Sequence, residues 1–524
     1  MASAARDLEQ LLSAIAESRG YAFPERLPAW KKRLASNAEQ VRAFLAAPGR
    51  ADASLLTMPE SHPVTARSDR FDYTAHEQGT RGVVDIARRV NSGEASAVDI
   101  AAEHLDRAES RRNLNAFITL DRNRVLTEAE AVDATVKRGS KLPLAGVPIA
   151  IKDAIAVKGY PMTCGTKVIE APISEADAEC VSRLRAAGAV IMGTTNLDEL
   201  GYAATGLHAP FGRIINPKAP DRIAGGSSGG SALAVAANLA AAALGTDTGG
   251  ALRLPASCCG IVGLKPTHGA ISSKGYAIRA PSLDSVGPMT RSVADCALVF
   301  EVLAGRPIGS MLGNSPGSTR IRVVKPTNYF FENVEEDDVA AVERAIGLFR
   351  SAGMSVADAR LRDVEHSPAA HFITVAAEAT EMFWDLLVRT GRHLGEDLRA
   401  RLEVGQFILA ADYIKAQRFR RHLREMFLEA LADGDVLVTP TVQVLPPKVD
   451  ESSVSVAAHA SSLLGRFTGP LNVAGLPGIT IPCGVTGDGA PVGLQIIGRP
   501  DDEASVFRVA HFWESILATV LVAS

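Results

Sequence analysis

Short apolar runs alternate with helical segments over most of this 524-residue chain. Five of the runs have the length of buried strands: 146–152, 189–193, 321–324, 435–440 and 479–484. The helical segments between or before them are 80–110, 124–138, 177–187 and most of 330–430. Strands interleaved with helices of this length predict an α/β fold, in which a large mixed β-sheet is covered by helices on both faces.

The first 72 residues differ from this pattern. Apolar residues recur at helical spacing between Leu8 and Ile15 and again around Phe44, and residues 51–72 are polar with two prolines. We therefore expect a small helical N-terminal extension with a linker (1–72) and a main domain over 73–524. Such an extension most simply serves packing or dimerisation, so a homodimer is one expected state.

The bulk composition excludes some classes of partner. The net charge is −4 and the pI is about 6.3, without the excess of Lys and Arg that nucleic-acid and membrane-surface proteins carry. The N-terminus lacks a secretory apolar region, and the Ala-rich run 231–245 is too short for a bilayer, so we expect it to form a buried helix. Six cysteines without metal or disulfide spacing favour a reduced, cytoplasmic location.

Lys152 is the first candidate for chemistry, because it ends the apolar run GVPIAIK and precedes Asp153. If the strand end is buried, the lysine is shifted toward its neutral form and can act as a base. The alternative is a lysine whose amine reaches solvent at the strand end.

A second candidate is AGGSSGGSA (224–232), which leads directly into an apolar segment. Glycines allow close approach to a ligand, and a helix start presents unpaired N–H groups; a flexible turn is the alternative. Residues 225–229 also match the G-x-S-x-G elbow of α/β-hydrolases, but the preceding residues make a poor strand.

The third candidate is GTDTGGALRLPA (245–256), in the Gly-, Pro- and Ser-rich connection 245–292. Its paired glycines between Asp247 and Arg253 predict a tight turn, whose successive N–H groups form a site for an oxyanion. A purely structural turn held by this ion pair is the alternative.

Together these segments resemble the amidase signature family. The resemblance runs through GGSSGGSALAVAA, GTDTGGALRLPASCCGIVGLKPTHG, SLDSVGPMTRSVADCA and FTGPLNVAGLPGITIPCG, over roughly residues 80–515. It implies a catalytic set of Lys152, a serine after a cis peptide at Ser227, and a nucleophile at position 251. That position holds Ala251, so the motif lacks its nucleophilic serine.

The resemblance also implies roles for the neighbouring residues. The amides of Thr248, Gly249, Gly250 and residue 251 are expected to form the oxyanion hole. Ser228 is expected to order the proton relay, and the Asp247–Arg253 pair to hold the loop. No metal and no organic cofactor is expected, because Lys152 takes the place of the usual histidine or zinc.

These residues predict the hydrolysis of a small-molecule carboxylic amide through an acyl-enzyme, in a form disabled at Ala251 that still binds substrate. Ala251 is either a deliberate Ser→Ala change or the mark of a natural, non-catalytic binding protein. Because every other member of the set is present, we favour the first. The alternative activity is the glutaminase subunit of a tRNA-dependent amidotransferase. Which amide is bound stays open, and the variable segment 161–167 and parts of 380–465 are the expected determinants.

Overall fold

The structure, a computed structural model, describes residues 41–46, 82–306, 321–432, 434–449 and 463–523. Within these residues the strands form one mixed sheet of eleven members in the order β1-β3-β2-β4-β6-β5-β10-β11-β9-β7-β8. In chain order the strands are β1 (Phe117–Leu120), β2 (Pro148–Lys152), β3 (Val190–Thr195), β4 (Ala242–Asp247), β5 (Val262–Lys265), β6 (Ser285–Thr290), β7 (Arg322–Pro326), β8 (Ser355–Ala359), β9 (Val436–Pro440), β10 (Gly478–Val485) and β11 (Pro491–Ile497).

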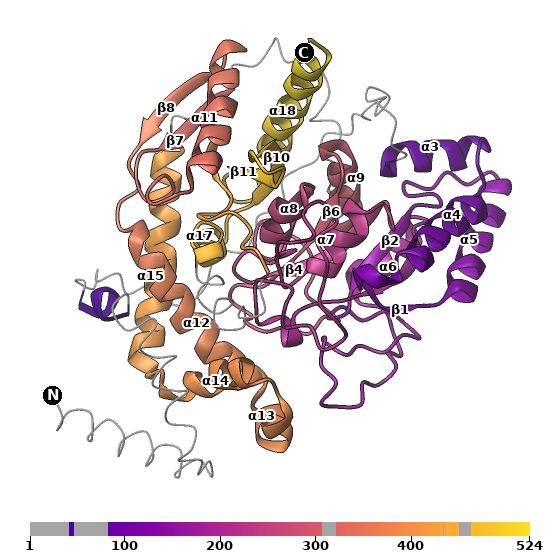
Figure 1. Ribbon diagram of the computed structural model, residues 1–524, viewed down its shortest axis with the longest axis horizontal. Coiled ribbons are helices and arrows are strands. Elements are labelled where there is room, and N and C mark those ends of the chain that lie inside the picture. Colours follow the sequence, from indigo (N-terminus) through magenta and orange to yellow (C-terminus); the bar gives the residue numbers. More distant parts are fainter. Residues whose placement is uncertain (1–40, 47–81, 307–320, 433, 450–462, 524) are drawn as a thin grey trace.

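Helices and strands alternate over much of the chain, whereas α12 to α15 follow one another without a strand between them (Figure 1). The α-helices are α3 (Val83–Ser92), α4 (Ala97–Ser110), α5 (Arg122–Lys137), α6 (Glu179–Ala186), α7 (Gly229–Ala236), α8 (Arg253–Cys259), α9 (Val293–Ala304), α11 (Glu336–Ser351), α12 (Ser367–Met382), α13 (Trp384–Thr390), α14 (Glu396–Val404), α15 (Ala410–Ala430), α17 (Gly469–Ala474) and α18 (Glu503–Ala523).

The sheet is antiparallel in the middle and has a parallel group on each side, and its edge strand β1 pairs antiparallel with β3. Strand β2 lies between β3 and β4 and is parallel to both, and β9, β7 and β8 form a second parallel group. Every pair from β4 through β6, β5, β10 and β11 to β9 is antiparallel. The parallel arrangement matters most at β2 and β4, because it brings their carboxyl ends to the same edge of the sheet.

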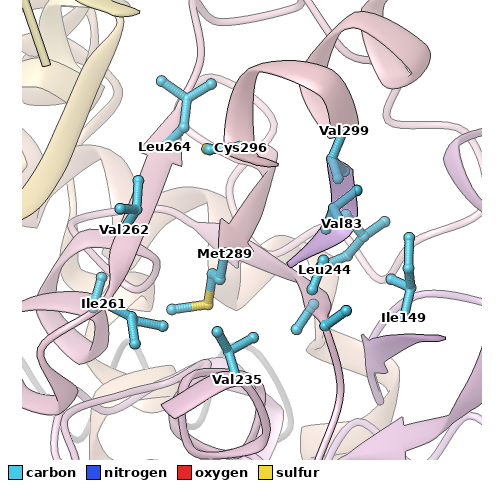
Figure 2. Packing of buried hydrophobic residues seen from close by; sticks show 14 of the residues in the cluster. Val83, Ile149, Val235, Leu244, Ile261, Val262, Leu264, Met289, Cys296 and Val299 are labelled. Carbon is cyan, nitrogen blue, oxygen red and sulfur yellow. The ribbon is translucent and has the colours of Figure 1, made fainter. Parts of the chain in front are cut away.

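Helices pack on the central strands from both sides. Helices α7 and α9 both contact β4 and β6; α8 packs with α7, and α18 packs with α9. Figure 2 shows Val235 of α7 and Val299 of α9 on opposite sides of Leu244 and Met289, which belong to β4 and β6. Strand β6 is buried at every residue, as expected for a strand covered on both faces. The predicted fold class is confirmed.

The prediction of one helix over the Ala-rich run 231–245 is wrong. Helix α7 ends at Ala236, Asn238 takes a positive φ of 57°, and the remaining alanines enter β4. Alanine has the highest intrinsic helix propensity, but a tertiary context overrides that preference. Here the second half of the run pairs with β2 and β6 at the centre of the sheet. The connection 245–292 likewise contains α8, β5 and β6 rather than being a bare loop.

The described part of the N-terminal extension is short. Residues 41–46 are helical, as predicted around Phe44, and they pack on α15. The Phe44 ring lies edge-on to Phe419 at 5.5 Å, and Lys415 donates to the Leu45 carbonyl. The predicted helix at 8–15, the linker 51–72 and the boundary at 73 lie outside the described residues. Among the helices that are described, none is long and apolar enough to cross a membrane.

Candidate active site

The parallel strands β2 and β4 end beside each other and supply the first part of the site. The pairing of Ile151 with Leu244 carries Lys152 to the level of the residues that follow Leu244, so its amine reaches Thr246. The glycine-rich segment before α7 adds the serines at 227 and 228. Three segments that are distant in sequence therefore converge on one lysine amine.

That amine is surrounded by hydroxyl groups. Lys152 Nζ lies 2.8 Å from Ser227 Oγ, 3.0 Å from Ser228 Oγ and 2.8 Å from Thr246 Oγ1. Lys152 and Ser228 are fully buried, and Ser227 is 1% exposed. Burial, assisted by the positive charge of Arg279, lowers the pKa of Lys152 to about 7. The amine is therefore available as a neutral base near neutral pH.

The hydrogen-bond directions favour one arrangement of protons for the neutral amine. Ser228 Oγ donates to the Thr246 carbonyl at 3.1 Å, so toward Lys152 it can only accept. If the amine gives its two N–H groups to Ser228 and Thr246, its lone pair is left for the hydroxyl of Ser227. Ser227 then keeps its own lone pairs to receive a proton from a neighbouring nucleophile.

The segment that carries Ser227 has no room for larger residues. The peptide bond between Gly226 and Ser227 is cis, at the position that the resemblance implied. A Cβ at Gly226 would lie 1.9 Å from Asp198 Oδ2, so only glycine fits there. No strand precedes this segment in the described chain, where residues 219–224 form turns and an isolated bridge, and the α/β-hydrolase elbow is therefore excluded.

The loop after β4 is held by a fully buried ion pair. The Arg253 guanidinium donates to Asp247 from Nε at 3.0 Å and from Nη2 at 3.1 Å, and it also donates to Gln495 and Asn472. Burial alone would raise the pKa of the Asp247 carboxyl, but the Arg253 charge and hydrogen bonds hold it well below its usual value. The two residues form the ion pair expected from the sequence, and its role in supporting catalysis stays a prediction.

The Asp247 carboxylate also accepts a hydrogen bond from one of the amides that we expected in the oxyanion hole. The Gly250 N–H donates to Asp247 Oδ1 at 2.7 Å, so in this conformation it is not available to a ligand. Within the described chain, the amides of Thr248, Gly249 and Ala251 donate to no other group. Those three amides therefore have free N–H groups in this conformation, and their predicted part in an oxyanion hole stays a prediction.

Ala251 lies next to the relay. Its carbonyl accepts a hydrogen bond from the Ser228 amide at 3.2 Å, and its side chain is 7% exposed. The position is therefore close to the two serines, as the family resemblance implied. A methyl group there can neither attack a carbonyl nor give up a proton, so the relay ends without a nucleophile.

A small pocket opens beside Lys152. The open space between its walls, including the mouth and the solvent in it, measures about 320 Å³, and the enclosed part is much smaller. Both segments predicted to set specificity reach it, 161–167 through Cys164 and 380–465 through Phe383. Its lining residues are Lys152, Ala154, Cys164, Leu200, Gly201, Thr246, Thr248, Ala277, Arg279, Asp284 and Phe383.

Several residues at the site were not predicted from the sequence. Thr246 and the pair Thr468 and Asn472 lie in motifs that were recognised, but their contacts with Lys152, the Gly249 carbonyl and Asp247 were not foreseen. His371 and Arg279 come from outside the motifs, and no sequence signal marks them. His371 Nε2 lies 3.0 Å from the Thr248 carbonyl, and burial lowers its pKa to about 4, so it is neutral.

Among the described residues, no group of His, Cys, Asp and Glu side chains that could share a metal ion lies at this pocket. In the described chain, the acidic and histidine side chains close enough to share an ion are Asp363, Glu365 and His366, which precede α12. Such exposed acidic groups are common in proteins without a bound ion. The expectation of a reaction without metal or cofactor stays a prediction.

A family model and the most similar known sequences both point to the same family. Residues 99–507 match the family model described as Amidase. The chain is 36% identical over 477 residues to the A subunit of the glutamyl-tRNA(Gln) amidotransferase of Koribacter versatilis, covering 83% of this chain and 98% of that protein. Further curated relatives at 34–37% identity have the same name.

Solved structures of the same family share the fold. A crystal structure of an amidase matches with a TM-score of 0.77 and 30% identity, over 83% of this chain and 99% of that one. The A subunit of the glutamyl-tRNA(Gln) amidotransferase of Thermotoga maritima matches with a TM-score of 0.67 and 31% identity, over 81% of this chain and 93% of that one.

Proposed function

Because the chain belongs to the amidase family, we propose that its pocket binds a carboxylic amide and lacks only the attacking oxygen that would cleave it. The observation that carries this proposal is the 2.8 Å contact between Lys152 Nζ and Ser227 Oγ, both buried beside position 251. A proton relay of this kind has no use without a nucleophile, yet its donors, acceptors and burial are all in place.

The mechanism follows from the direction of the relay. With a serine at position 251, Oγ attacks the amide carbon and its proton passes to Ser227, while the Ser227 proton passes to neutral Lys152. The negative charge formed on the carbonyl oxygen is stabilised by the amides of Thr248, Gly249 and residue 251. The C–N bond then breaks as the relay returns a proton to the leaving amine. Water, activated by the same relay, releases the acid.

The first test restores the missing oxygen. Ala251→Ser should create hydrolysis of small amides, because losing the nucleophile of a comparable serine hydrolase costs about 10⁶ in rate. Release of product from an aryl-amide panel measures this, with Ala251→Gly as the matched control that changes the side chain without adding a hydroxyl. If the serine protein stays inert on amides, esters and carbamates, the proposal is wrong.

The origin of Ala251 can be tested separately. The intact relay and the buried Asp247–Arg253 pair support the view that the parent protein carries a serine there, since drift after loss of function would also be expected to alter its buried partners. The genomic codon for position 251 decides between this and a natural binding protein. A serine codon shows that the parent protein carries the nucleophile and that Ala251 is a deliberate change.

A second candidate is the glutaminase subunit of a tRNA-dependent amidotransferase, and the curated relatives favour it over a free-standing amidase. The helical character of residues 330–430 was one reason to prefer the free-standing enzyme from the sequence. That argument fails, because any continuous match to 83% of this chain includes these residues, so the amidotransferase relatives share the region. The N-terminal part of the argument lies mostly outside the described residues.

A partner subunit distinguishes this candidate from a free-standing amidase. Purification of the tagged chain from its own source cells, followed by size-exclusion chromatography with light scattering, tests this. A stoichiometric second protein supports the amidotransferase, whereas a homodimer or monomer of this chain alone supports the amidase.

A further inference from the structure

Arg279 is a cation in the pocket wall that has no carboxylate partner in the described chain. It lines the same pocket as Lys152, and none of the ion pairs within 4.0 Å among the described residues includes it. Its Nε atom is buried and lacks a hydrogen-bond partner. Burial lowers the pKa of Arg279, in line with a positive charge that has been desolvated without a direct ion pair.

The contacts that Arg279 does make position it without neutralising it. Nη1 donates to the carbonyl of Gly201, and the guanidinium lies over the Tyr202 ring, 5.0 Å from its centre. Arg401 approaches the same ring at 5.9 Å, but it is paired with Asp397 at 2.6 Å. Two arginines therefore flank one tyrosine. The one in the pocket wall has no carboxylate within 4.0 Å among the described residues, and the more distant Asp284 charge only partly offsets the effect of burial on its pKa.

Asp284 is the acidic residue of the pocket wall, and its oxygens are already used. Oδ1 accepts the Thr248 hydroxyl, and Oδ2 accepts the backbone N–H groups of Arg279 at 2.6 Å and of Ala280 at 3.1 Å. Asp284 thus fixes the backbone of Arg279 rather than its guanidinium. The N–H groups of the Arg279 guanidinium therefore stay available to a planar anion such as a carboxylate, whose geometry a guanidinium matches best.

Arg279 is also close to the relay. An ideal Cβ built on Gly201 would lie 3.5 Å from Ser227 Oγ and 3.8 Å from Arg279 Nη1, so these two atoms face the same glycine. A carboxylate held by Arg279 would therefore sit only a few bonds from an amide carbon placed near Ser227. The modest size of the pocket also favours a short molecule.

We propose that Arg279 determines specificity by binding a carboxylate on the substrate, which makes the substrate a small amide with a negative charge close to its scissile bond. This inference rests on the proposed function and extends it to a substrate class. It applies equally to a free-standing amidase and to the glutaminase of an amidotransferase, because it concerns only the anionic end of the substrate.

The test uses the chain as it exists, since Ala251 allows binding without turnover. Isothermal titration measures succinamate, a monoamide with a free carboxylate, against succinamide, its neutral diamide of nearly the same size. Because hydrogen bonds to charged groups contribute about 1.5–3 kcal/mol, succinamate should bind about 10- to 150-fold more tightly than succinamide. Arg279→Met should remove this preference. Arg222→Met, at a buried arginine that is paired with Asp488 and does not line the pocket, should retain it.

The outcomes separate the two proposals. Equal binding of the two amides, or a preference that survives Arg279→Met in a folded protein, overturns the role of Arg279 but leaves the proposed function intact. If neither amide binds, the proposal that the substrate is a small anionic amide of this kind is wrong. Hydrolysis by the Ala251→Ser protein then decides the proposed function. If Arg279→Met does not fold, Arg279→Lys replaces it, and a reduced preference is expected because the ammonium lacks the planar fork.

Discussion

Two lysines end two strands of the sheet, and only one of them has the surroundings of a catalytic base. Lys152 ends β2 and Lys265 ends β5; both are completely buried. Burial lowers the pKa of each to about 7. By sequence position, burial and proton affinity the two residues are nearly equivalent.

The difference lies in what each amine contacts. Lys152 Nζ meets three side-chain hydroxyls and lines the pocket. Lys265 Nζ donates to the carbonyl of Pro266, a group that has no proton to transfer, and it is not among the residues of the pocket wall. A shifted pKa therefore does not identify a catalytic base on its own. A chain of exchangeable protons that leads to a substrate is also required.

The comparison predicts a large difference between two matched substitutions in the Ala251→Ser protein. Lys152→Met removes the base and should lower kcat/KM by about 10²–10⁴, the usual contribution of general acid–base catalysis. Lys265→Met removes an equally buried amine and should leave kcat/KM within a few-fold of the parent. Steady-state hydrolysis of one amide by the three proteins measures this.

Circular dichroism melting accompanies these rates, because either substitution alters a buried site. Methionine has nearly the volume of lysine and removes the cost of burying an amine, so both variants are expected to fold. An equal loss of activity in two folded variants would contradict the distinction between the lysines.

The surroundings of Lys152 were predicted from the sequence better than those of Lys265. Lys152 was identified because it ends an apolar run and matches a family motif, and Ser227 and Asp247 were found in the same way. Lys265 also ends a strand, but the connection 245–292 was not recognised as containing β5, so its burial was not foreseen. Arg279 and His371 were missed for a physical reason: their roles depend on long-range packing that leaves no local pattern.

The pH dependence of the Ala251→Ser protein sharpens the comparison. Only the neutral amine of Lys152 accepts a proton, so kcat/KM should fall about tenfold per pH unit below the pKa of about 7 and level off above it. Lys265→Met should leave this acid limb in place. Arg279→Met should move the limb to higher pH on a neutral substrate, because the Arg279 charge is the next cause of the low pKa after burial. If Lys265→Met instead removes or shifts the acid limb, the titrating group is Lys265, and the assignment of the base to Lys152 is wrong.

The smallest predicted effect concerns the third hydroxyl around Lys152. Thr246→Val keeps the shape of the side chain and removes one acceptor for the amine, so the lone pair of Lys152 is less firmly directed at Ser227. One hydrogen bond contributes about 0.5–1.5 kcal/mol, which corresponds to a loss of about two- to tenfold in kcat for the Ala251→Ser protein. The matched control is Thr267→Val, two residues after Lys265, whose hydroxyl accepts the Asp501 amide and has no link to the relay. If both valine variants lose activity equally, the loss reflects general loosening of the fold, and Thr246 has no part in orienting the base.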